Sequence, residues 1–160
     1  MKRLRPSWDE YFLRLAELVG SRSTCDRGHA GAVAVKDKRI LATGYSGAPI
    51  GLPHCDEVGH EMYTVTGEDG KASRHCTRTS HSETNVIVNA ARFGVSLDGA
   101  TMYSNFLPCY SCTKNLINAG VVRVVTLQDY HASEQSKKIL KQAGVKLSII
   151  KKQIAQYKDQ

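Results

Sequence analysis

Two short segments of the sequence carry side chains that bind divalent metals. The first is His81-Ser82-Glu83, and the second is Pro108-Cys109-Tyr110-Ser111-Cys112. Cys109 and Cys112 are three residues apart, so on a helix both thiols point to the same side. With His81 they offer three ligands that zinc prefers, and a tetrahedral ion would keep its fourth position for water. Because zinc lowers the pKa of such a water to about 7, the three residues predict a catalytic metal centre.

The acidic residue next to this set has the properties of a proton shuttle. Residues two apart do not share a helix face, so His81 must lie at or before the first helical residue and Glu83 inside the first turn. Glu83 then falls on the same stripe as Ile87 and Ala90, the side that faces the core. Burial without a nearby cation raises the pKa of a carboxylate, which favours Glu83 as the group that accepts and returns protons.

Each segment alone has a structural alternative. Ser80-x-x-Glu83 fits a capping box, in which the glutamate only satisfies backbone donors. A lone C-x-x-C is equally half of a structural zinc site. The two segments each open a predicted helix with a strand between them, and this joint arrangement favours the catalytic interpretation.

Hydrophobic periodicity predicts the elements that position these residues. A hairpin is followed by alternating helices and strands, which predicts an α/β fold: a three-layer α/β/α sandwich around a mixed five-stranded sheet. A long polar, glycine-rich connection spans 44–80, and its length indicates a functional or partly folded segment. The expected helices are Ser7–Ser21, Ser82–Phe93, Cys109–Ala119 and Ser133–Ala143, and the expected strands are Gly31–Lys36, Arg39–Thr43, Thr101–Ser104, Val121–Leu127 and Val145–Ile150.

Composition limits the class of protein. The 160 residues are 41% hydrophobic and 23% charged, which excludes a disordered or collagen-like chain and predicts one domain over 1–160 with a polar tail at 151–160. The net charge of +7 favours an anionic partner. We expect no membrane partner and no signal peptide, because charged residues follow the basic start, and hence a cytoplasmic protein. Five cysteines then indicate metal binding or catalysis rather than disulfides.

Several further motifs make the sequence resemble the deoxycytidylate (dCMP) deaminase family, in the cytidine deaminase-like superfamily. The resemblance runs from Trp8 to Ile150. It implies zinc-dependent hydrolysis of dCMP to dUMP and ammonia, feeding thymidylate synthesis, with Glu83 moving a proton from water to N3 of the base. The motifs are Gly44-Tyr-Ser-Gly-Ala-Pro49, Cys55-Asp-Glu57, Cys76-Thr-Arg-Thr-Ser-His81-Ser-Glu83, Ala90-Ala-Arg-x-Gly94 and Asp129-Tyr130.

The same resemblance implies regulation and assembly. Members are commonly homohexamers, activated by dCTP and inhibited by dTTP with Mg²⁺. It assigns Tyr45, Ser46, Gly47 and Pro49 to effector binding, and Tyr130 to the substrate nucleotide. It assigns Arg92 to phosphate or subunit contacts, and the distance along the helix favours a subunit interface. Each assignment has a structural alternative. The loop could be only a glycine-assisted turn, and Tyr130 only an ordinary loop aromatic. Arg92 could be a solvated arginine on the polar stripe with Asn85 and Asn89.

Some members of this family also hold a second, structural zinc. Cys25 and Cys55 resemble two of its ligands. His75 or Cys76 would complete the set, with His60 ranked below them, and such a site would order the long connection. The alternative is a group of reduced, partly buried thiols.

Departures from the family pattern leave the nucleotide open. Ser46 replaces an asparagine of the family loop, and Asn105, Leu107 and His29 also differ from the usual residues. The alternatives are deamination of dCTP or another cytosine or adenine nucleotide, and a non-catalytic zinc module that binds nucleic acid. Because the basic residues are scattered along the chain, we expect no nucleic-acid partner.

Overall fold

The computed structural model describes residues 5–66, 72–151 and 154–155, and its centre is one mixed sheet. The five strands lie in the order β2 (Arg39–Tyr45), β1 (Gly31–Lys36), β5 (Thr101–Phe106), β6 (Arg123–Tyr130) and β7 (Lys146–Ile149). β1 is antiparallel to both of its neighbours, while β5, β6 and β7 are parallel. A two-residue strand, β8 (Ile154–Ala155), pairs with the end of β6. The predicted mixed five-stranded sheet is confirmed.

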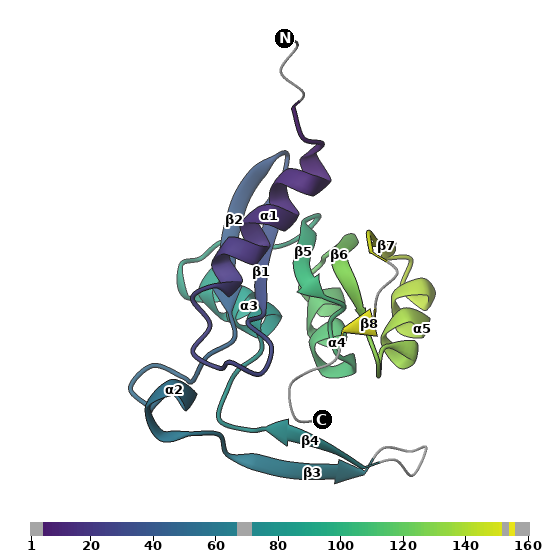
Figure 1. The fold of residues 1–160 in the computed structure, drawn as a ribbon. Helices are drawn as coiled ribbons and strands as arrows, with labels where there is room; N and C mark the ends of the chain where they lie inside the picture. The colour runs from purple at the N-terminus through teal and green to yellow at the C-terminus, as the bar shows by residue number, and fades with distance from the viewer. Residues whose placement is uncertain (1–4, 67–71, 152–153, 156–160) are drawn as a thin grey trace.

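Helices cover both faces of this sheet, as the prediction of three layers requires (Figure 1). On one face, α1 (Trp8–Gly20) buries Phe12, Leu13 and Ala16 against β1, β5 and β6. On the other face, α3 (Ser82–Arg92), α4 (Tyr110–Asn118) and α5 (Glu134–Gln142) close the larger core. Most bounds agree with the prediction to within one or two residues, and β6 continues to Tyr130. Among the described residues, no helix combines the length and apolar character needed to cross a membrane.

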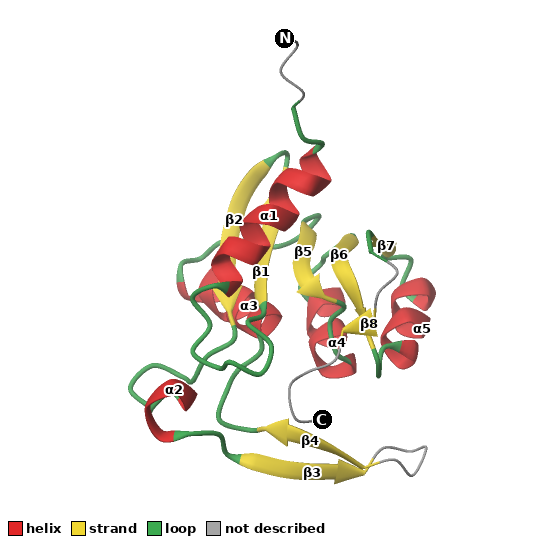
Figure 2. Cartoon of the chain, viewed as in Figure 1, coloured by secondary structure: helices red, strands yellow, loops and turns green. Residues whose placement is uncertain are grey.

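The connection between β2 and α3 contains three elements that the sequence analysis did not resolve (Figure 2). They are α2 (Cys55–Val58) and the antiparallel hairpin of β3 (Met62–Thr66) and β4 (Ala72–Cys76). The hairpin projects from the body of the protein and its strands are mostly exposed. The expectation that this segment is partly folded is therefore confirmed, although the device is a hairpin with little apolar burial. The expected polar tail lies partly outside the described residues.

Close contact between β2 and the start of α3 fixes the entrance of that helix. A Cβ atom at Gly44 would lie 2.4 Å from the Ser82 carbonyl oxygen and 2.5 Å from the Val86 nitrogen, so only glycine fits. From α3, Asn85 Nδ2 donates to the Tyr45 carbonyl at 2.7 Å, and Asn89 Nδ2 donates to the Thr43 carbonyl at 2.9 Å. The two asparagines predicted on a polar stripe thus bond the edge strand of the sheet.

One ion pair ties α1 to the sheet, and it gives a prediction on stability. Arg123 donates to both carboxylate oxygens of Asp9 at 2.9 and 2.7 Å, and Tyr103 Oη donates to Asp9 at 2.9 Å. The Arg123 guanidinium is the main cause that lowers the pKa of Asp9. Because the pKa of Asp9 is lower in the folded state, its ionised form stabilises the fold at pH values above its unfolded-state pKa of about 3.9. This contribution is lost as the pH falls through the folded-state pKa.

Replacing Asp9 with asparagine should therefore destabilise the fold by about 1–2 kcal/mol at pH 7, because a hydrogen-bonded charge pair is lost. The difference in unfolding free energy from wild type should shrink below about pH 4. Denaturant unfolding at several pH values measures it. Glu17→Gln, an exposed change on the same helix, is the control. An Asp9→Asn effect that is the same at pH 7 and pH 3.5 would contradict the assignment.

Candidate metal centre

Two helix starts bring the first group of metal ligands together. His81 is the N-cap of α3 and Cys109 is the N-cap of α4, and neither side chain makes a capping hydrogen bond. His81 Nδ1 instead lies 3.5 Å from the sulfur of Cys109 and 3.5 Å from that of Cys112. Zinc binds sulfur at about 2.3 Å and nitrogen at about 2.0 Å, so ligand atoms at these separations fit around one ion. The three predicted ligands, His81, Cys109 and Cys112, therefore lie close enough together to bind one ion.

The electrostatics of the trio suit a cation. The pKa of Cys109 is lowered to about 4, first by the hydrogen bond from Cys112 and also by His81. The pKa of Cys112 is raised, first by its hydrogen bond to Cys109 and then by burial. One thiolate therefore forms readily, and a bound divalent ion would supply the charge that keeps the second thiol deprotonated. Thr84 Oγ1 lies 3.5 Å from the Cys112 sulfur, and a hydrogen bond between them helps to orient this ligand.

Glu83 lies beside these ligands and is almost fully buried, with 6% of its surface exposed. Burial is the main cause that raises its pKa, while the nearby His81 opposes the shift. Ser82 Oγ donates to its carboxylate at 3.2 Å. The capping-box alternative is wrong, because the N-cap of α3 is His81, while the Ser80 backbone forms a bridge with Gly47. The carboxylate is therefore available to a bound ligand.

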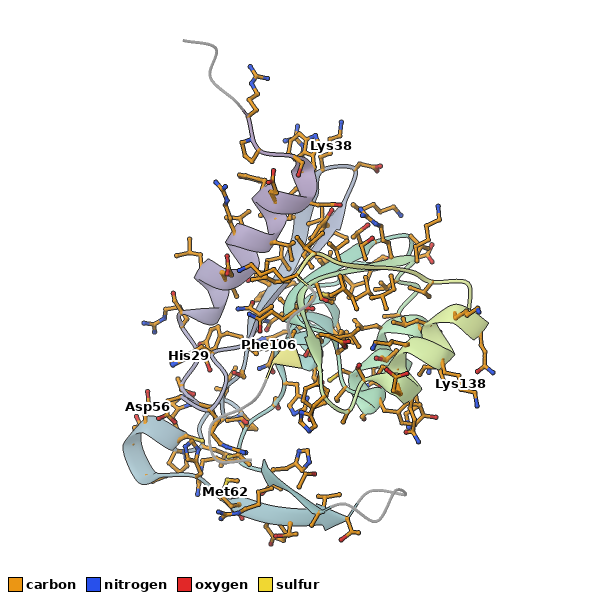
Figure 3. The ribbon with its side chains drawn as sticks, turned by 45° about the vertical axis from the view of Figure 1, so that its right-hand side comes forward. His29, Lys38, Asp56, Met62, Phe106 and Lys138 are labelled. Carbon is orange, nitrogen blue, oxygen red and sulfur yellow. The ribbon has the colours of Figure 1, made fainter. Side chains whose placement is uncertain are left out.

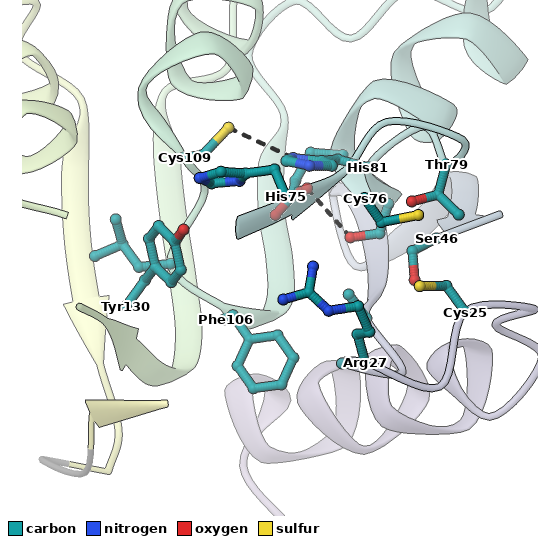
Figure 4. Close-up of a pocket in the computed structure, with 15 residues that line it drawn as sticks. Cys25, Arg27, Ser46, His75, Cys76, Thr79, His81, Phe106, Cys109 and Tyr130 are labelled. Carbon is teal, nitrogen blue, oxygen red and sulfur yellow. Dashed lines mark hydrogen bonds between the residues drawn. The ribbon is translucent and has the colours of Figure 1, made fainter. Parts of the chain in front are cut away.

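A pocket opens over this centre, and Figure 4 shows its lining. His81, Glu83 and Cys109 line it together with Tyr130 and Ser46, two residues assigned to nucleotide binding from the sequence. The other assigned residues lie outside the lining: Tyr45, Gly47, Pro49 and Arg92. Arg92 is exposed at the far end of α3, with its guanidinium 5.8 Å from the centroid of the Phe93 ring.

The sequence analysis missed three contributors to this pocket. Arg27, from the loop before β1, and Phe106, at the end of β5, line it. His75, assigned above to a second zinc, also lines it, and Figure 4 shows the Arg27, His75 and Tyr130 side chains around one opening. No local motif marks Arg27 as a pocket residue. Its only signal in the sequence is its position two residues after Cys25, a predicted metal ligand.

A second group of metal ligands lies beside the pocket. It consists of Cys25, Cys55, His60 and Cys76, whose donor atoms all lie within 4.8 Å of one another. The Cys55 and Cys76 sulfurs are 3.6 Å apart, and Cys25 Sγ is 3.8 Å from His60 Nδ1. The other ring nitrogen of His60 lies 2.9 Å from Asp26 Oδ1, the carboxylate contact that orients ligating histidines. Four protein donors close a tetrahedral site, as in structural zinc sites.

The histidine of this group is His60, whereas the sequence analysis ranked His75 above it. His75 is not in this group, because neighbouring residues of a strand point to opposite sides. Cys76 therefore points into the cluster, while His75 faces the pocket and its Nε2 lies 2.8 Å from Ser73 Oγ. His60, ranked lower from the sequence, takes its place. Burial is the main cause that raises the pKa of Cys55 to about 12, whereas the pKa of Cys76 is lowered to about 7.

This second group joins three stretches of the chain, at Cys25, at Cys55 and His60, and at Cys76, so its loss should destabilise the pocket wall. Cys55→Ser should remove one zinc ion per chain and lower the stability by about 2–4 kcal/mol, because metal binding there is coupled to folding. Metal analysis and thermal unfolding measure the two effects. Thr64→Ala, an exposed change on the β3–β4 hairpin that carries Cys76, should alter neither. Unchanged zinc content in Cys55→Ser would contradict the site.

Comparison with known proteins agrees with this site. The family model for the "cytidine and deoxycytidylate deaminase zinc-binding region" matches residues 6–128. ComE operon protein 2 of Bacillus subtilis (strain 168) is 39% identical over 141 residues, which cover 88% of this chain and 70% of that protein. The deoxycytidylate deaminase of Saccharomyces cerevisiae is 37% identical over 142 residues, covering 89% of this chain and 44% of that protein. The chain thus spans less than half of the yeast relative.

Solved structures give the same result. The crystal structure of the dCMP deaminase from the cyanophage S-TIM5, in complex with dCMP and dUMP, aligns with a TM-score of 0.73 at 29% identity and covers 92% of this chain and 99% of that one. The fold and the metal ligands define a zinc-dependent deaminase. The chain belongs to the dCMP deaminase family, within the cytidine and deoxycytidylate deaminase superfamily. The resemblance drawn from the motifs is confirmed.

Proposed function

We propose that this protein hydrolyses dCMP to dUMP and ammonia and so feeds thymidylate synthesis. The observation that carries the proposal is the buried carboxylate of Glu83, which lines one pocket together with His81 and Cys109 of the candidate zinc site. The family of the chain and the dCMP and dUMP bound in the cyanophage relative favour this nucleotide. All five cysteines are assigned to metal binding rather than to disulfides, which supports a cytoplasmic enzyme.

The side chains around the metal centre divide the chemistry between them. Zinc held by His81, Cys109 and Cys112 would supply a Lewis acid that activates water at neutral pH. Glu83 accepts a proton from water and delivers it to N3 of cytosine as the water oxygen bonds to C4. It then moves the remaining proton of that oxygen to the amino nitrogen, so that the C4–N bond breaks and ammonia leaves. The raised pKa of Glu83 serves this cycle, because the group must hold a proton in one step and release it in the next.

Other side chains around the pocket suit the phosphate end of the nucleotide. Arg27 and His75 bring nitrogen donors to the pocket, and Tyr130 adds an aromatic ring with only 7% exposed surface. An arginine offers paired donors that match the oxygens of a phosphate. We therefore assign Arg27 to the substrate phosphate and Tyr130 to the wall beside the nucleoside.

Steady-state kinetics on the zinc-loaded protein test the substrate. We expect kcat/KM for dCMP to exceed that for deoxycytidine by about 100-fold, since the phosphate contacts would be lost with the nucleoside. A preference for dCTP, deoxycytidine or an adenine nucleotide would overturn the assignment of dCMP. Absence of ammonia release from every nucleotide would favour the zinc module without catalysis.

Regulation and assembly form a finer part of the proposal. We assign the loop around Ser46 to control by dCTP as activator and by dTTP as inhibitor, with Mg²⁺, because Ser46 lies both in this loop and in the pocket wall. The exposed end of α3, with Phe93 74% exposed beside Arg92, supports a subunit contact in a homohexamer. Kinetics with each effector, and sedimentation of the Phe93→Ser variant, test the two assignments.

A further inference from the structure

A second cavity lies between the start of α1 and the β1–β2 hairpin. This groove has a volume of about 550 Å³ and opens to solvent. Lys38 marks the tip of the β1–β2 hairpin. This tip lies at the opposite end of the molecule from Asp56 and Met62, two residues near the second metal group (Figure 3). The groove is therefore separate from the pocket and from the loop at Ser46. Its lining consists of Arg5, Pro6, Trp8, Tyr11, Phe12, Lys38, Arg39 and Ile40.

The charge of the groove is of one sign. Arg5, Lys38 and Arg39 contribute three cations, and no described residue of the lining carries a carboxylate. Asp9 and Asp37 line the adjacent cavity instead, and Asp9 is already bonded to Arg123. Three exposed cations around one concavity attract a ligand with several negative charges.

Aromatic rings form the wall between these cations. Trp8 and Tyr11 keep 51% and 43% of their surface exposed, although both belong to a helix that buries its other face. The Trp8 ring is held in place, stacked on Phe12 with centroids 5.6 Å apart and planes 20° apart. The Trp8 ring is already contacted by Phe12 and by the Lys38 ammonium, so the half-exposed ring of Tyr11 beside it is the surface on which a flat base can stack.

The hairpin turn holds a cation over this wall. Asp37 and Lys38 have φ angles of 50° and 62°, the left-handed pair of values that two-residue hairpins require and that usually selects glycine or asparagine. Lys38 takes this position and places its Nζ 5.4 Å from the centroid of the Trp8 ring. The turn thus positions a charge next to the aromatic surface.

We propose that this groove binds a nucleoside triphosphate, with Arg5, Lys38 and Arg39 on the phosphates and the Tyr11 ring against the base, next to Trp8. The volume lies within the range of about 300–1,000 Å³ that small-ligand sites occupy. One mononucleotide fills such a cavity, whereas a nucleic-acid strand needs an extended track. The site is additional to the deamination of dCMP and does not depend on it.

The chain offers a direct probe, because Trp8 is its single tryptophan. We expect ATP to change the Trp8 fluorescence in a saturable way, and adenosine and inorganic triphosphate each to bind at least 10-fold more weakly. Equal binding of ATP and inorganic triphosphate would overturn the role of the base. Tighter binding of an oligothymidylate than of ATP would overturn the mononucleotide in favour of a strand.

A matched pair of variants locates the site. The double variant Lys38→Ala, Arg39→Ala should weaken ATP binding at least 10-fold, whereas Lys138→Ala, Lys141→Ala, with the same change of charge on α5, should leave it unchanged. Equal weakening in both would show only a general effect of net charge and would overturn the proposal. Because the readout is fluorescence rather than ammonia release, the result stands whether or not the protein deaminates dCMP.

Discussion

Glu83→Gln should lower the turnover of dCMP about 10³-fold while the zinc content stays at the wild-type value. The amide keeps the size and the polar contact with Ser82 but cannot take a proton from water or return it to the base. Removal of a buried titratable group without loss of volume should leave the unfolding temperature unchanged or slightly higher. Ammonia release and metal analysis on the same preparation provide both measurements.

A neighbouring variant separates proton transfer from metal binding. Cys112→Ser should also abolish turnover, but through loss of one zinc ion per chain, since it removes one of three protein donors. If Glu83→Gln retained more than about a tenth of the wild-type turnover, proton transfer by this carboxylate would be excluded. Zinc loss from Glu83→Gln would instead indicate a ligand role for the residue.

Arg27→Ala should raise KM for dCMP about 10- to 100-fold with little change in kcat, the result expected when a charged hydrogen bond to the phosphate is removed. Kinetics with deoxycytidine should be nearly unaffected, because the nucleoside carries no phosphate. The side chain lines the pocket across from the metal ligands and donates to the Arg74 carbonyl at 3.1 Å. Arg22→Ala, an exposed change earlier in the same loop, is the control. Equal losses for dCMP and deoxycytidine would contradict a phosphate contact.

The candidate metal site at the starts of α3 and α4 could be predicted from the sequence because its geometry is local. His81, Cys109 and Cys112 lie in two short motifs at helix starts, and the helix period alone sets the direction of the two thiols. The α/β architecture was predictable for a similar reason, since β1 and the segment Val121–Leu127, which leads into β6, are nearly continuous apolar runs.

The connection between β2 and α3 was harder to predict because its order depends on contacts between distant residues. β3 is exposed along almost its whole length, so no alternation of apolar residues marks it. The choice between His60 and His75 depends on the pairing of β3 with β4, in which Cys76 lies opposite Met62 and His75 opposite Tyr63. Arg27 reaches the pocket only through the folded loop before β1, which no motif reveals.

The uncapped starts of α3 and α4 have a thermodynamic consequence. At both ends a ligand side chain takes the position that serine or aspartate usually occupies, so neither His81 nor Cys109 satisfies the free backbone donors of its first turn. Coordination of one zinc ion by His81 and Cys109 would then hold the starts of the two helices together. Zinc affinity and protection of the first-turn amides from hydrogen exchange should therefore rise and fall together, so that exchange rates at these two turns report the occupancy of the ion.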